Sequence, residues 1–384
     1  MTTEVFDVAV VGAGIVGASA AFHLAERGLR VVVLEARGGH AEGSTGLSFA
    51  SVRAQWADPL NTEISWNSIQ RWRDFPKKYG LDVGYQANGY LLLFPEEVWE
   101  KQLEAVALQR SYGVPVEVLT FERAQELSRF DAAGLGGVTW GRADGQIDPH
   151  GATGAFLELA KRNGAVVRFN FAVDRAEPRA DGDWVLGAGQ RSLQAHYVVN
   201  AAGGWGAELG ALAGFDVPVV HSRRNIYATA EGVTDKYVPM TVDAGTGIYF
   251  RSEGSRILIG GTNPGEPDGY HTQLDWEWLE GLIERGAERF PWLLDAPLDR
   301  GASWAGTYEN TPDHDAILGP EPGAPTWVHA CGFSGHGLMQ APEVGRLVAE
   351  QVKDGAMTSY DVARLSVQRF RQGSHPEHNI SLVF

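Results

Sequence analysis

Apolar and polar positions at the start of the chain predict a strand, a turn, a helix and a second strand. The segment from residue 7 to residue 36 reads DVAVVGAGIVGASAAFHLAERGLRVVVLEA. Two short apolar runs flank a longer stretch, and the turn before that stretch carries glycines 12, 14 and 17. This order of elements predicts a β-α-β unit with a glycine-rich first turn.

The rest of the chain shows both helical and strand periodicities. Residues 96–113 have helical spacing, and residues 273–293 form an amphipathic pattern that Pro291 stops. Three alternating stretches separated by glycine turns predict strands at 223–230, 247–253 and 255–262. The fold class is therefore α/β (α+β overall).

Composition and charge narrow the class of protein. A chain of 384 residues favours two domains. The net charge of −16 argues against nucleic acid or an acidic membrane surface as the main partner. One cysteine excludes an intramolecular disulfide and suits the reducing cytoplasm, where we expect the protein. The apolar N-terminal run follows acidic residues and is broken by glycines, so it resembles neither a signal peptide nor a membrane span.

The N-terminal turn has the spacing of a dinucleotide-binding loop. Gly12 permits the tight turn, Gly14 lets the backbone approach a pyrophosphate, and Gly17 lets the helix pack on the strand. The helix N-terminus then faces the phosphates. Glu35 ends the second strand, where an acid accepts the ribose hydroxyls and disfavours NADP.

FAD and NAD both remain possible from this turn alone. Three further glycine-rich stretches follow at residues 43–56, 198–214 and 331–339. A long ligand that lies across the carboxyl ends of several strands would need such loops, and FAD is such a ligand.

Several motifs together resemble the amine-oxidising flavoproteins of the D-amino-acid oxidase superfamily. The nearest groups are monomeric sarcosine oxidase, the β subunits of sarcosine oxidase and proline dehydrogenase, and dimethylglycine dehydrogenase. The most specific motifs are TYENTPDHDAILGP (307–320) and GFSGHGLMQAPEVGRLVAE (332–350). The match runs nearly end to end, and it also includes VVGAGIVGASAAFHLAERG, GQIDPHGATGAFLELAKRNGA, VVNAAGGWGAELG, GIYFRSEG and ILIGGTNPG.

The resemblance implies an FAD-binding Rossmann-like domain interleaved with a mixed-sheet substrate domain. The first would take residues 1–85, 145–220 and 305–384, and the second residues 86–144 and 221–304. In this family the GFSGHG loop closes over the flavin, with its amides facing the pyrimidine edge and a helix from about Gln340 pointing its positive end there. The implied FAD contacts are Gly12, Gly14, Ile15, Val16, Gly17, Glu35, Ala36, Arg37, Ser44, Thr45, Gly46, Val173, Ala201, Ala202, Gly203, Trp205, Gly332, Phe333, Ser334, Gly335, His336, Gly337, Leu338 and Met339.

Two positions at which relatives link flavin covalently carry no reactive side chain in this sequence. Gly306 stands where the monomeric sarcosine oxidases have cysteine, and residues 43–51 contain no histidine. His40 lies in the loop before that segment. We therefore expect FAD to be held non-covalently, and we expect no metal site.

Four residues are candidates for holding the substrate. The resemblance places Arg53 near the substrate or flavin, and Tyr308 at the substrate carboxylate. Tyr249 would point from a strand toward the flavin, and Arg251, on the same strand face, could take a carboxylate bidentately. The alternatives are a surface ion pair for either arginine and a half-buried strand residue for Tyr249.

The expected reaction is oxidation of a small secondary or tertiary amino acid, such as sarcosine, proline or an N-methylated relative, to an imine. Oxidation of a D-amino acid or a 2-hydroxy acid is the alternative reaction, and a non-catalytic flavoprotein or a subunit of a hetero-oligomer is the alternative class. The electron acceptor could be O₂, a quinone or a partner protein. Residues 263–273 contain no lysine, and Met339 replaces another lysine of the monomeric oxidases, so we expect a dehydrogenase or a slow oxidase.

Overall fold

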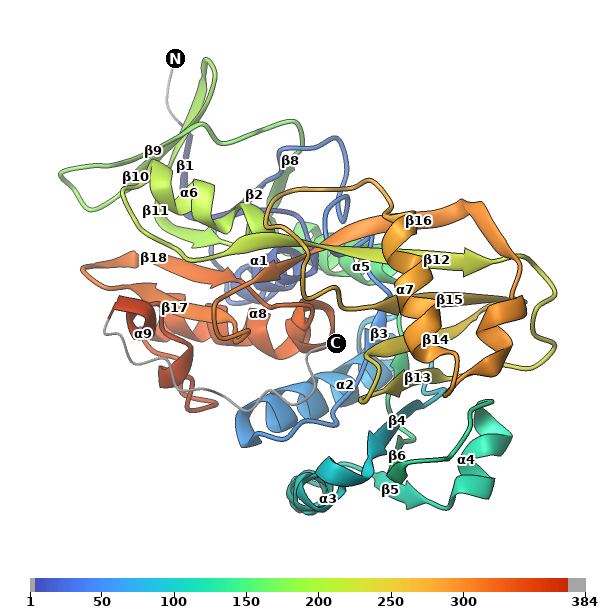
Figure 1. The fold of residues 1–384 in the computed structure, drawn as a ribbon. Coiled ribbons are helices and arrows are strands. Elements are labelled where there is room, and N and C mark those ends of the chain that lie inside the picture. Colours follow the sequence, from blue (N-terminus) through green and yellow to red (C-terminus); the bar gives the residue numbers. More distant parts are fainter. Residues whose placement is uncertain (1–3, 372–384) are drawn as a thin grey trace.

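The computed structural model describes residues 4–371, which form two large sheets and a short strand pair (Figure 1). The first sheet has the order β17 (Ile317–Glu321), β18 (Ala324–Cys331), β11 (Arg191–Asn200), β1 (Glu4–Val11), β2 (Val31–Leu34) and β8 (Val166–Arg168), with β10 (Trp184–Ala188) paired to β11 and β9 (Arg175–Pro178) paired to β10. The second has the order β16 (Leu298–Asn310), β12 (Val220–Thr229), β15 (Arg256–Gly261), β14 (Ile248–Glu253), β13 (Met240–Asp243), β4 (Tyr90–Pro95), β6 (Leu135–Gly141) and β5 (Val116–Leu119). A short pair joins β3 (Ser51–Val52) to β7 (Gly145–Gln146).

The centre of the first sheet is parallel, and this brings the glycine-rich loops together. Strands β8, β2, β1, β11 and β18 run in one direction. At the carboxyl end of β1, Val11 pairs with Leu34 of β2 on one side and with Asn200 of β11 on the other. Asn200 in turn pairs with His329 of β18. The loops that follow four of these strands therefore leave the sheet at the same edge, where ligands of open α/β sheets bind.

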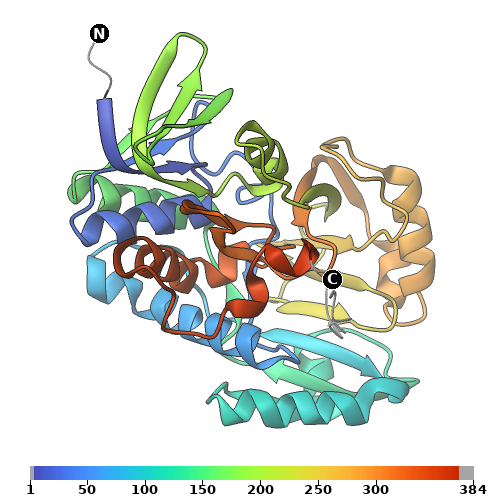
Figure 2. The ribbon, with the colours of Figure 1, turned by 90° about the vertical axis from the view of Figure 1, so that its left-hand side faces the viewer.

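Helices cover one face of the first sheet (Figure 2). Val8 and Val10 of β1 belong to the core beneath these helices, whereas Ala9 and Val11 belong to a second core on the opposite face. Both faces of β1 are therefore buried, as a continuous apolar run predicts. The helices are α1 (Ile15–Glu26), which packs between α5 (Pro149–Arg162) and α8 (Gly337–Asp354), and α2 (Pro59–Tyr79), which packs on α8.

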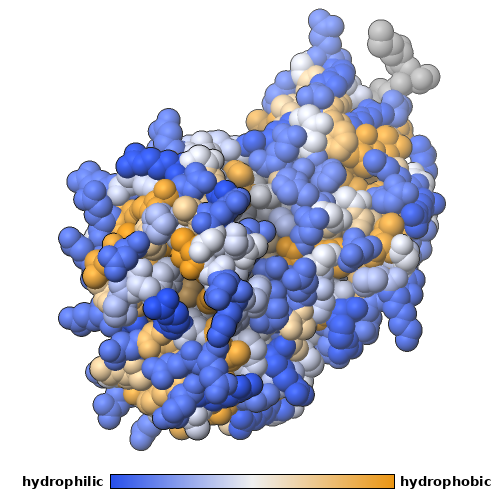
Figure 3. Space-filling model, turned by 90° about the vertical axis from the view of Figure 1, so that its right-hand side faces the viewer, coloured by the Kyte–Doolittle hydropathy of each residue, from blue (hydrophilic) through white to orange (hydrophobic). Residues whose placement is uncertain are grey.

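Shorter helices complete the two halves of the molecule. The second sheet is covered by α3 (Glu96–Ser111), α4 (Phe121–Leu127), α7 (Trp276–Gly286) and the 3₁₀ turn η2 (Pro291–Asp295). The remaining ones are η1 (Gly203–Trp205), α6 (Gly206–Leu212), η3 (Ala363–Leu365) and α9 (Gln368–Arg371). The face shown in Figure 3 is mostly hydrophilic, with apolar side chains in separate patches.

The predicted fold class is confirmed by this architecture. The helix expected at 273–293 is α7, which ends before Pro291, and the helix expected from Gln340 begins three residues earlier, at Gly337. The strands of the first sheet lie within the predicted FAD-binding segments. The domain boundaries stay a prediction, and β16 runs five residues past the one at 305. Within residues 4–371, no helix is long and apolar enough to cross a membrane.

Candidate functional site

A cleft of about 240 Å³ lies at the edge of the first sheet where the glycine-rich loops converge. Most of the predicted cofactor contacts line it. These are Gly12, Gly14, Ile15, Val16, Glu35, Ala36, Arg37, Ser44, Thr45, Val173, Ala201, Ala202, Gly203, Trp205, Gly335, Gly337 and Leu338. The cleft thus runs from the end of β2 to the loop before α8 and is lined by segments far apart in the sequence.

The three glycines of the first turn occupy the positions that their predicted roles require. Gly12 has a φ of 109°, and a Cβ there would lie 2.3 Å from the Ala201 carbonyl oxygen. A Cβ at Gly17 would lie 2.1 Å from the Gly12 carbonyl oxygen, so glycine alone permits this packing of α1. A Cβ at Gly14 would meet only the Thr45 hydroxyl, at 3.2 Å, and would otherwise project into open space. The pyrophosphate of a dinucleotide fits that space.

Glu35 lies at the carboxyl end of β2 and faces the cleft. Its carboxylate accepts hydrogen bonds from the backbone N–H groups of Ala13 and Arg37, both at 2.8 Å. The side chain is therefore fixed beside the first turn, where it can accept ribose hydroxyls. Tyr270, from the segment after β15, accepts a 2.8 Å hydrogen bond from Arg37 and packs against Trp205. That segment covers this end of the cleft, and its His271 is exposed.

The loop before α8 is held by the end of β16. The N–H groups of Gly332 and Ser334 donate to the side chain and to the carbonyl of Glu309, at 3.1 and 3.0 Å. A Cβ at Gly335 would lie 2.5 Å from the Tyr308 ring, and the φ of Gly335 is 91°. The loop can therefore cross Tyr308 at close range only with glycine at that position.

Seven predicted cofactor residues do not line this cleft. Gly17, Gly46, Gly332 and Phe333 pack behind it, whereas Ser334, His336 and Met339 line an adjoining cavity. Ten further residues of the cleft wall were not predicted, although Thr307, Glu309 and Gly43 lie in stretches that the sequence analysis singled out. These are Val11, Leu34, Ala41, Glu42, Gly43, Ser48, Phe171, Thr307, Glu309 and Ala330.

The adjoining cavity has a volume of about 60 Å³ and shares Ser48, Tyr308, Gly335 and Leu338 with the cleft. Its other walls come from β4, β13, β14, the segment before α2, the loop before α8 and the first turn of α8. They are formed by Phe49, Ala50, Ser51, Arg53, Tyr90, Met240, Tyr249, Ser334, His336 and Met339. Three of the four predicted substrate residues therefore meet in one small chamber beside the cofactor cleft.

Arg53 is buried in this chamber against aromatic rings and a buried acid. Its guanidinium lies 3.9 Å from the centre of the Trp56 ring and donates to the Gln55 carbonyl at 2.6 Å. Burial lowers the pKa of Arg53. Asp144 accepts from the Ala54 N–H at 2.9 Å and from the Gln55 amide at 3.0 Å, and burial raises its pKa to about 7.

Tyr308 lies between two buried cations. The Arg224 guanidinium is 4.5 Å from the centre of the Tyr308 ring, and its Nε has no hydrogen-bond partner among the described residues. Burial raises the pKa of Tyr308, and Arg224 and Arg53 oppose that shift. The phenol is therefore protonated near neutrality and can donate a hydrogen bond. Neither Arg224 nor Tyr90 was predicted, because the pairing of distant strands places them.

Tyr249 and Arg251 lie on one face of β14 but do not share an environment. Tyr249 is buried in the chamber, with its ring 5.0 Å from Phe49. Arg251 donates to the Phe49 carbonyl at 3.0 Å and pairs with Glu253 at 2.5 Å. The structure therefore directs the Arg251 guanidinium away from both cavities.

His336 is buried against Trp56, with 4.4 Å between the ring centres. Burial lowers the pKa of His336 to about 3, so the imidazole is neutral at ordinary pH. This environment agrees with a role in the shape of the loop.

The two potential linkage positions lie outside the cleft wall. A Cβ at Gly306 would lie 2.7 Å from the Leu47 carbonyl oxygen, which leaves little room for a side chain. His40 lies near Gly154 of α5, 3.3 Å from where a Cβ would stand. Non-covalent binding stays a prediction. Among the described residues, no cluster of His, Cys, Asp or Glu is arranged to hold a metal ion.

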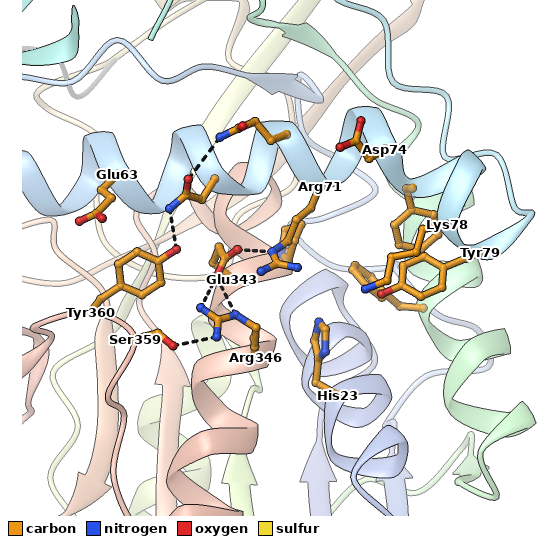
Figure 4. Close-up of a pocket in the computed structure, with 15 residues that line it drawn as sticks. His23, Glu63, Arg71, Asp74, Lys78, Tyr79, Glu343, Arg346, Ser359 and Tyr360 are labelled. Carbon is orange, nitrogen blue, oxygen red and sulfur yellow. Dashed lines mark hydrogen bonds and ion pairs between the residues drawn. The ribbon is translucent and has the colours of Figure 1, made fainter. Parts of the chain in front are cut away.

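A larger cavity, of about 540 Å³, lies on the helical side between α1, α2 and α8 (Figure 4). Arg71 and Arg346 reach the buried Glu343 from two helices, and Tyr360 accepts from Asn67 at 2.9 Å. These polar groups thus pair with one another, and none of the glycine-rich loops reaches the cavity. The cleft and its chamber are the better candidate site.

Comparison with known proteins gives a family match over most of the chain. The family model for DAO, FAD dependent oxidoreductase, matches residues 7–351. FAD-dependent oxidoreductase domain-containing protein 1 of Xenopus laevis is 29% identical over 95% of this chain and 82% of its own length. Mitochondrial dimethylglycine dehydrogenase of Mus musculus is 26% identical over 95% of this chain but only 44% of its own length. The crystal structure of L-proline dehydrogenase from P. horikoshii has a TM-score of 0.89 and 28% identity, and covers 98% of this chain and 100% of its own.

Proposed function

Because the chain belongs to the DAO family of FAD-dependent oxidoreductases, we propose that it oxidises the C–N bond beside the carboxylate of a small secondary or tertiary amino acid. The product would be an imine, which water hydrolyses. The main support for this proposal is the chamber of about 60 Å³, which brings Arg53 together with Tyr90, Tyr249 and Tyr308 at the wall of the cofactor cleft.

FAD is the cofactor, as the sequence predicted, and the residues of the cleft fit it. The space over Gly14 and the N-terminus of α1 suits the pyrophosphate, and Glu35 suits the adenosine ribose. The loop that Glu309 holds suits the flavin end. When bound, FAD supplies acceptance of the hydride, which no side chain of the chain can provide.

The chamber residues hold and orient the amino acid. Arg53 presents a planar fork of N–H donors that suits a carboxylate, and the Tyr308 hydroxyl donates alongside it. The apolar faces of Tyr249, Leu338 and Met339 exclude water around the α-carbon. Low polarity also favours the uncharged form of the amine, which is the form that loses a hydride.

The small volume of the chamber and the buried Arg53 in its wall favour a compact amino acid with a free carboxylate. Names of relatives support this substrate class, since they include sarcosine dehydrogenase and glycine oxidase. The absence of lysine from 263–273 and the presence of Met339 support a dehydrogenase or a slow oxidase. Non-covalent FAD and a cytoplasmic location are also part of the proposal, although some relatives are mitochondrial.

An anaerobic panel tests the substrate class. Sarcosine, proline, N-methylated amino acids, D-amino acids and 2-hydroxy acids are mixed in turn with the FAD-loaded protein, and loss of flavin absorbance is followed. Bleaching by a secondary or tertiary amino acid, with little by its decarboxylated amine, is the expected result. Bleaching only by D-amino acids or hydroxy acids would contradict the substrate class, and no bleaching by any compound would favour a non-catalytic flavoprotein.

Admission of air to the reduced protein then tests the acceptor. We expect slow reoxidation by O₂ and faster turnover with an artificial electron acceptor. Reoxidation as fast as that of an efficient oxidase would contradict the proposal of a dehydrogenase.

A further inference from the structure

Glu309 is a half-buried carboxyl group in the wall of the cofactor cleft, and the proposed chemistry does not use it. It follows Tyr308 on β16, so its side chain lies on the opposite face of the strand from the substrate chamber. Its Oε2 accepts the Gly332 N–H at 3.1 Å, and a Cβ at Gly203 would lie 3.5 Å from the same oxygen. Glu309 thus contacts the loops that follow β11 and β18.

No arginine or lysine side chain forms an ion pair with Glu309 among residues 4–371. Two backbone N–H groups, of Gly332 and Phe333, favour its charged form, but burial outweighs them and raises the pKa of Glu309 to about 7. We therefore expect the carboxyl to change its charge near neutrality, and shifted pKa values of this kind are common at functional sites.

The titratable side chains beside Glu309 are a histidine and a cysteine. His221 of β12 stands opposite Glu309 in the strand pair, and burial lowers the pKa of His221, while Glu208 opposes and Arg37 adds to that shift. The Cys331 thiol of β18 has its pKa raised by burial and by Glu309. Burial therefore favours the neutral form of both side chains.

Three other charged side chains line the same cleft, Glu35, Arg37 and Glu42, and Arg37 donates to Tyr270 at 2.8 Å. Arg224 and Arg53 lie around Tyr308, on the other side of β16. Arg369 is paired with Asp313 at 2.7 Å. A change of charge at Glu309 should act directly on a ligand in the cleft, because Glu309 lines the cleft and a bound cofactor would displace the solvent that screens it.

We propose that Glu309 takes up one proton from solvent when the flavin in this cleft is reduced. Reduction by a hydride equivalent brings two electrons and one proton to the cofactor and adds one negative charge to the cleft. An ionised Glu309 repels that charge, and a protonated Glu309 does not. The proton count of the whole site is then two per two electrons: one on the cofactor and one on the Glu309 carboxylate.

The dependence of the reduction potential on pH measures this proton. One proton per two electrons gives about 30 mV per pH unit, and two give about 60 mV. We expect about 60 mV near neutral pH for the wild type and about 30 mV for Glu309→Gln, whose amide oxygen still accepts the Gly332 N–H. Glu309→Asp retains an ionisable group and should retain most of the steeper slope.

Asp144→Asn is the matched control, because burial also raises the pKa of the Asp144 carboxyl to about 7. It lies behind Arg53 and should leave the slope unchanged. Equilibration with a redox dye of known potential, under a chemical reductant, gives the slope for each variant. No amino acid is needed, so the result is independent of the proposed substrate, and the FAD dissociation constant of each variant is measured alongside.

Several outcomes would overturn the proposal. A wild-type slope of about 30 mV would do so without any variant, even if Glu309→Gln failed to bind FAD. Equal slopes of about 60 mV in the wild type and in Glu309→Gln would place both protons on the cofactor and leave Glu309 as an anchor of the loop. Loss of the slope in Asp144→Asn alone would assign the proton to Asp144.

Discussion

At the scale of single residues, the environment of Arg53 determines what the chamber can bind. The guanidinium is buried against Trp56 and lies in the field of Asp144, so it is held in one position before any ligand arrives. Three tyrosines surround it, and their hydroxyl groups add directional donors without adding charge. Such a site selects a planar anion such as a carboxylate.

Arg53→Lys keeps the positive charge but removes the planar fork, and Tyr308→Phe removes one donor. We expect kcat/KM for the substrate to fall about tenfold to hundredfold in each, since a hydrogen bond to a charged group contributes about 1.5–3 kcal/mol. The fall should appear mainly as a higher KM, with flavin content unchanged. Steady-state kinetics and flavin absorbance measure both.

Arg251→Lys is the matched control, because Arg251 is also buried but is bonded to the Phe49 carbonyl and to Glu253. Its KM should change less. A larger rise in KM for Arg251→Lys than for Arg53→Lys would contradict this assignment and would indicate that Arg251 binds the substrate carboxylate.

At the scale of elements, the contact between α1 and α8 supports both ends of the cleft. Helix α1 begins at the first glycine turn, and α8 begins at the loop over Tyr308. Gly345 allows the two helices to approach, because a Cβ there would lie 2.2 Å from the Ser19 hydroxyl and 2.8 Å from the Ala20 nitrogen. The separation of the two loops thus depends on a residue outside the cleft.

Gly345→Ala should lower the free energy of unfolding by about 1–3 kcal/mol, because the added methyl group meets backbone atoms that cannot rotate away. Gly281→Ala on α7 is the control, since a Cβ there would meet only the flexible Arg285 at 3.6 Å. The free energy of unfolding of Gly281→Ala should rise by up to about 1 kcal/mol. Urea titration measures the free energy of unfolding of both variants. An unchanged free energy of unfolding for Gly345→Ala would mean that α8 can move away from α1.

Elements were predictable from the sequence where their signals are local. The first β-α-β unit, the role of each glycine in its turn and the stop of α7 before Pro291 depend on residues close together in the chain. Tyr90 was not predictable, because the parallel pairing of β4 with β13 brings it to the chamber. Arg224 and Glu309 depend in the same way on the register of β12 with β16. Registers between distant strands leave no mark in a single sequence.

At the scale of the whole molecule, FAD would fill a cleft lined by segments from residue 11 to residue 338. The cofactor therefore acts as part of the core and joins loops that follow four strands of the first sheet. A ligand that binds the folded state alone stabilises it, by about 2.7 kcal/mol at one hundred times its dissociation constant.

Acid precipitation of the yellow protein should leave the flavin in the supernatant, because the two usual linkage positions offer no nucleophile in the cleft. The apoprotein should unfold at a lower temperature, and added FAD should restore the transition. FMN is the control, since it lacks the adenosine half that Glu35 and the first turn would hold. Flavin that remains with the pellet would show a covalent bond, and full restoration by FMN would contradict the assignment of the Glu35 end.

The position of β18 in the first sheet has a consequence for synthesis on the ribosome. This strand ends at Cys331, yet it pairs with β11 and is followed by the loop that completes the flavin end of the cleft. A nascent chain cannot pair that strand until residue 331 has left the exit tunnel. The first β-α-β unit must therefore wait, with its phosphate-binding turn open, until the strand arrives. We expect the cofactor to be captured only after β18 has paired, and chains that stop before β18 to emerge without it.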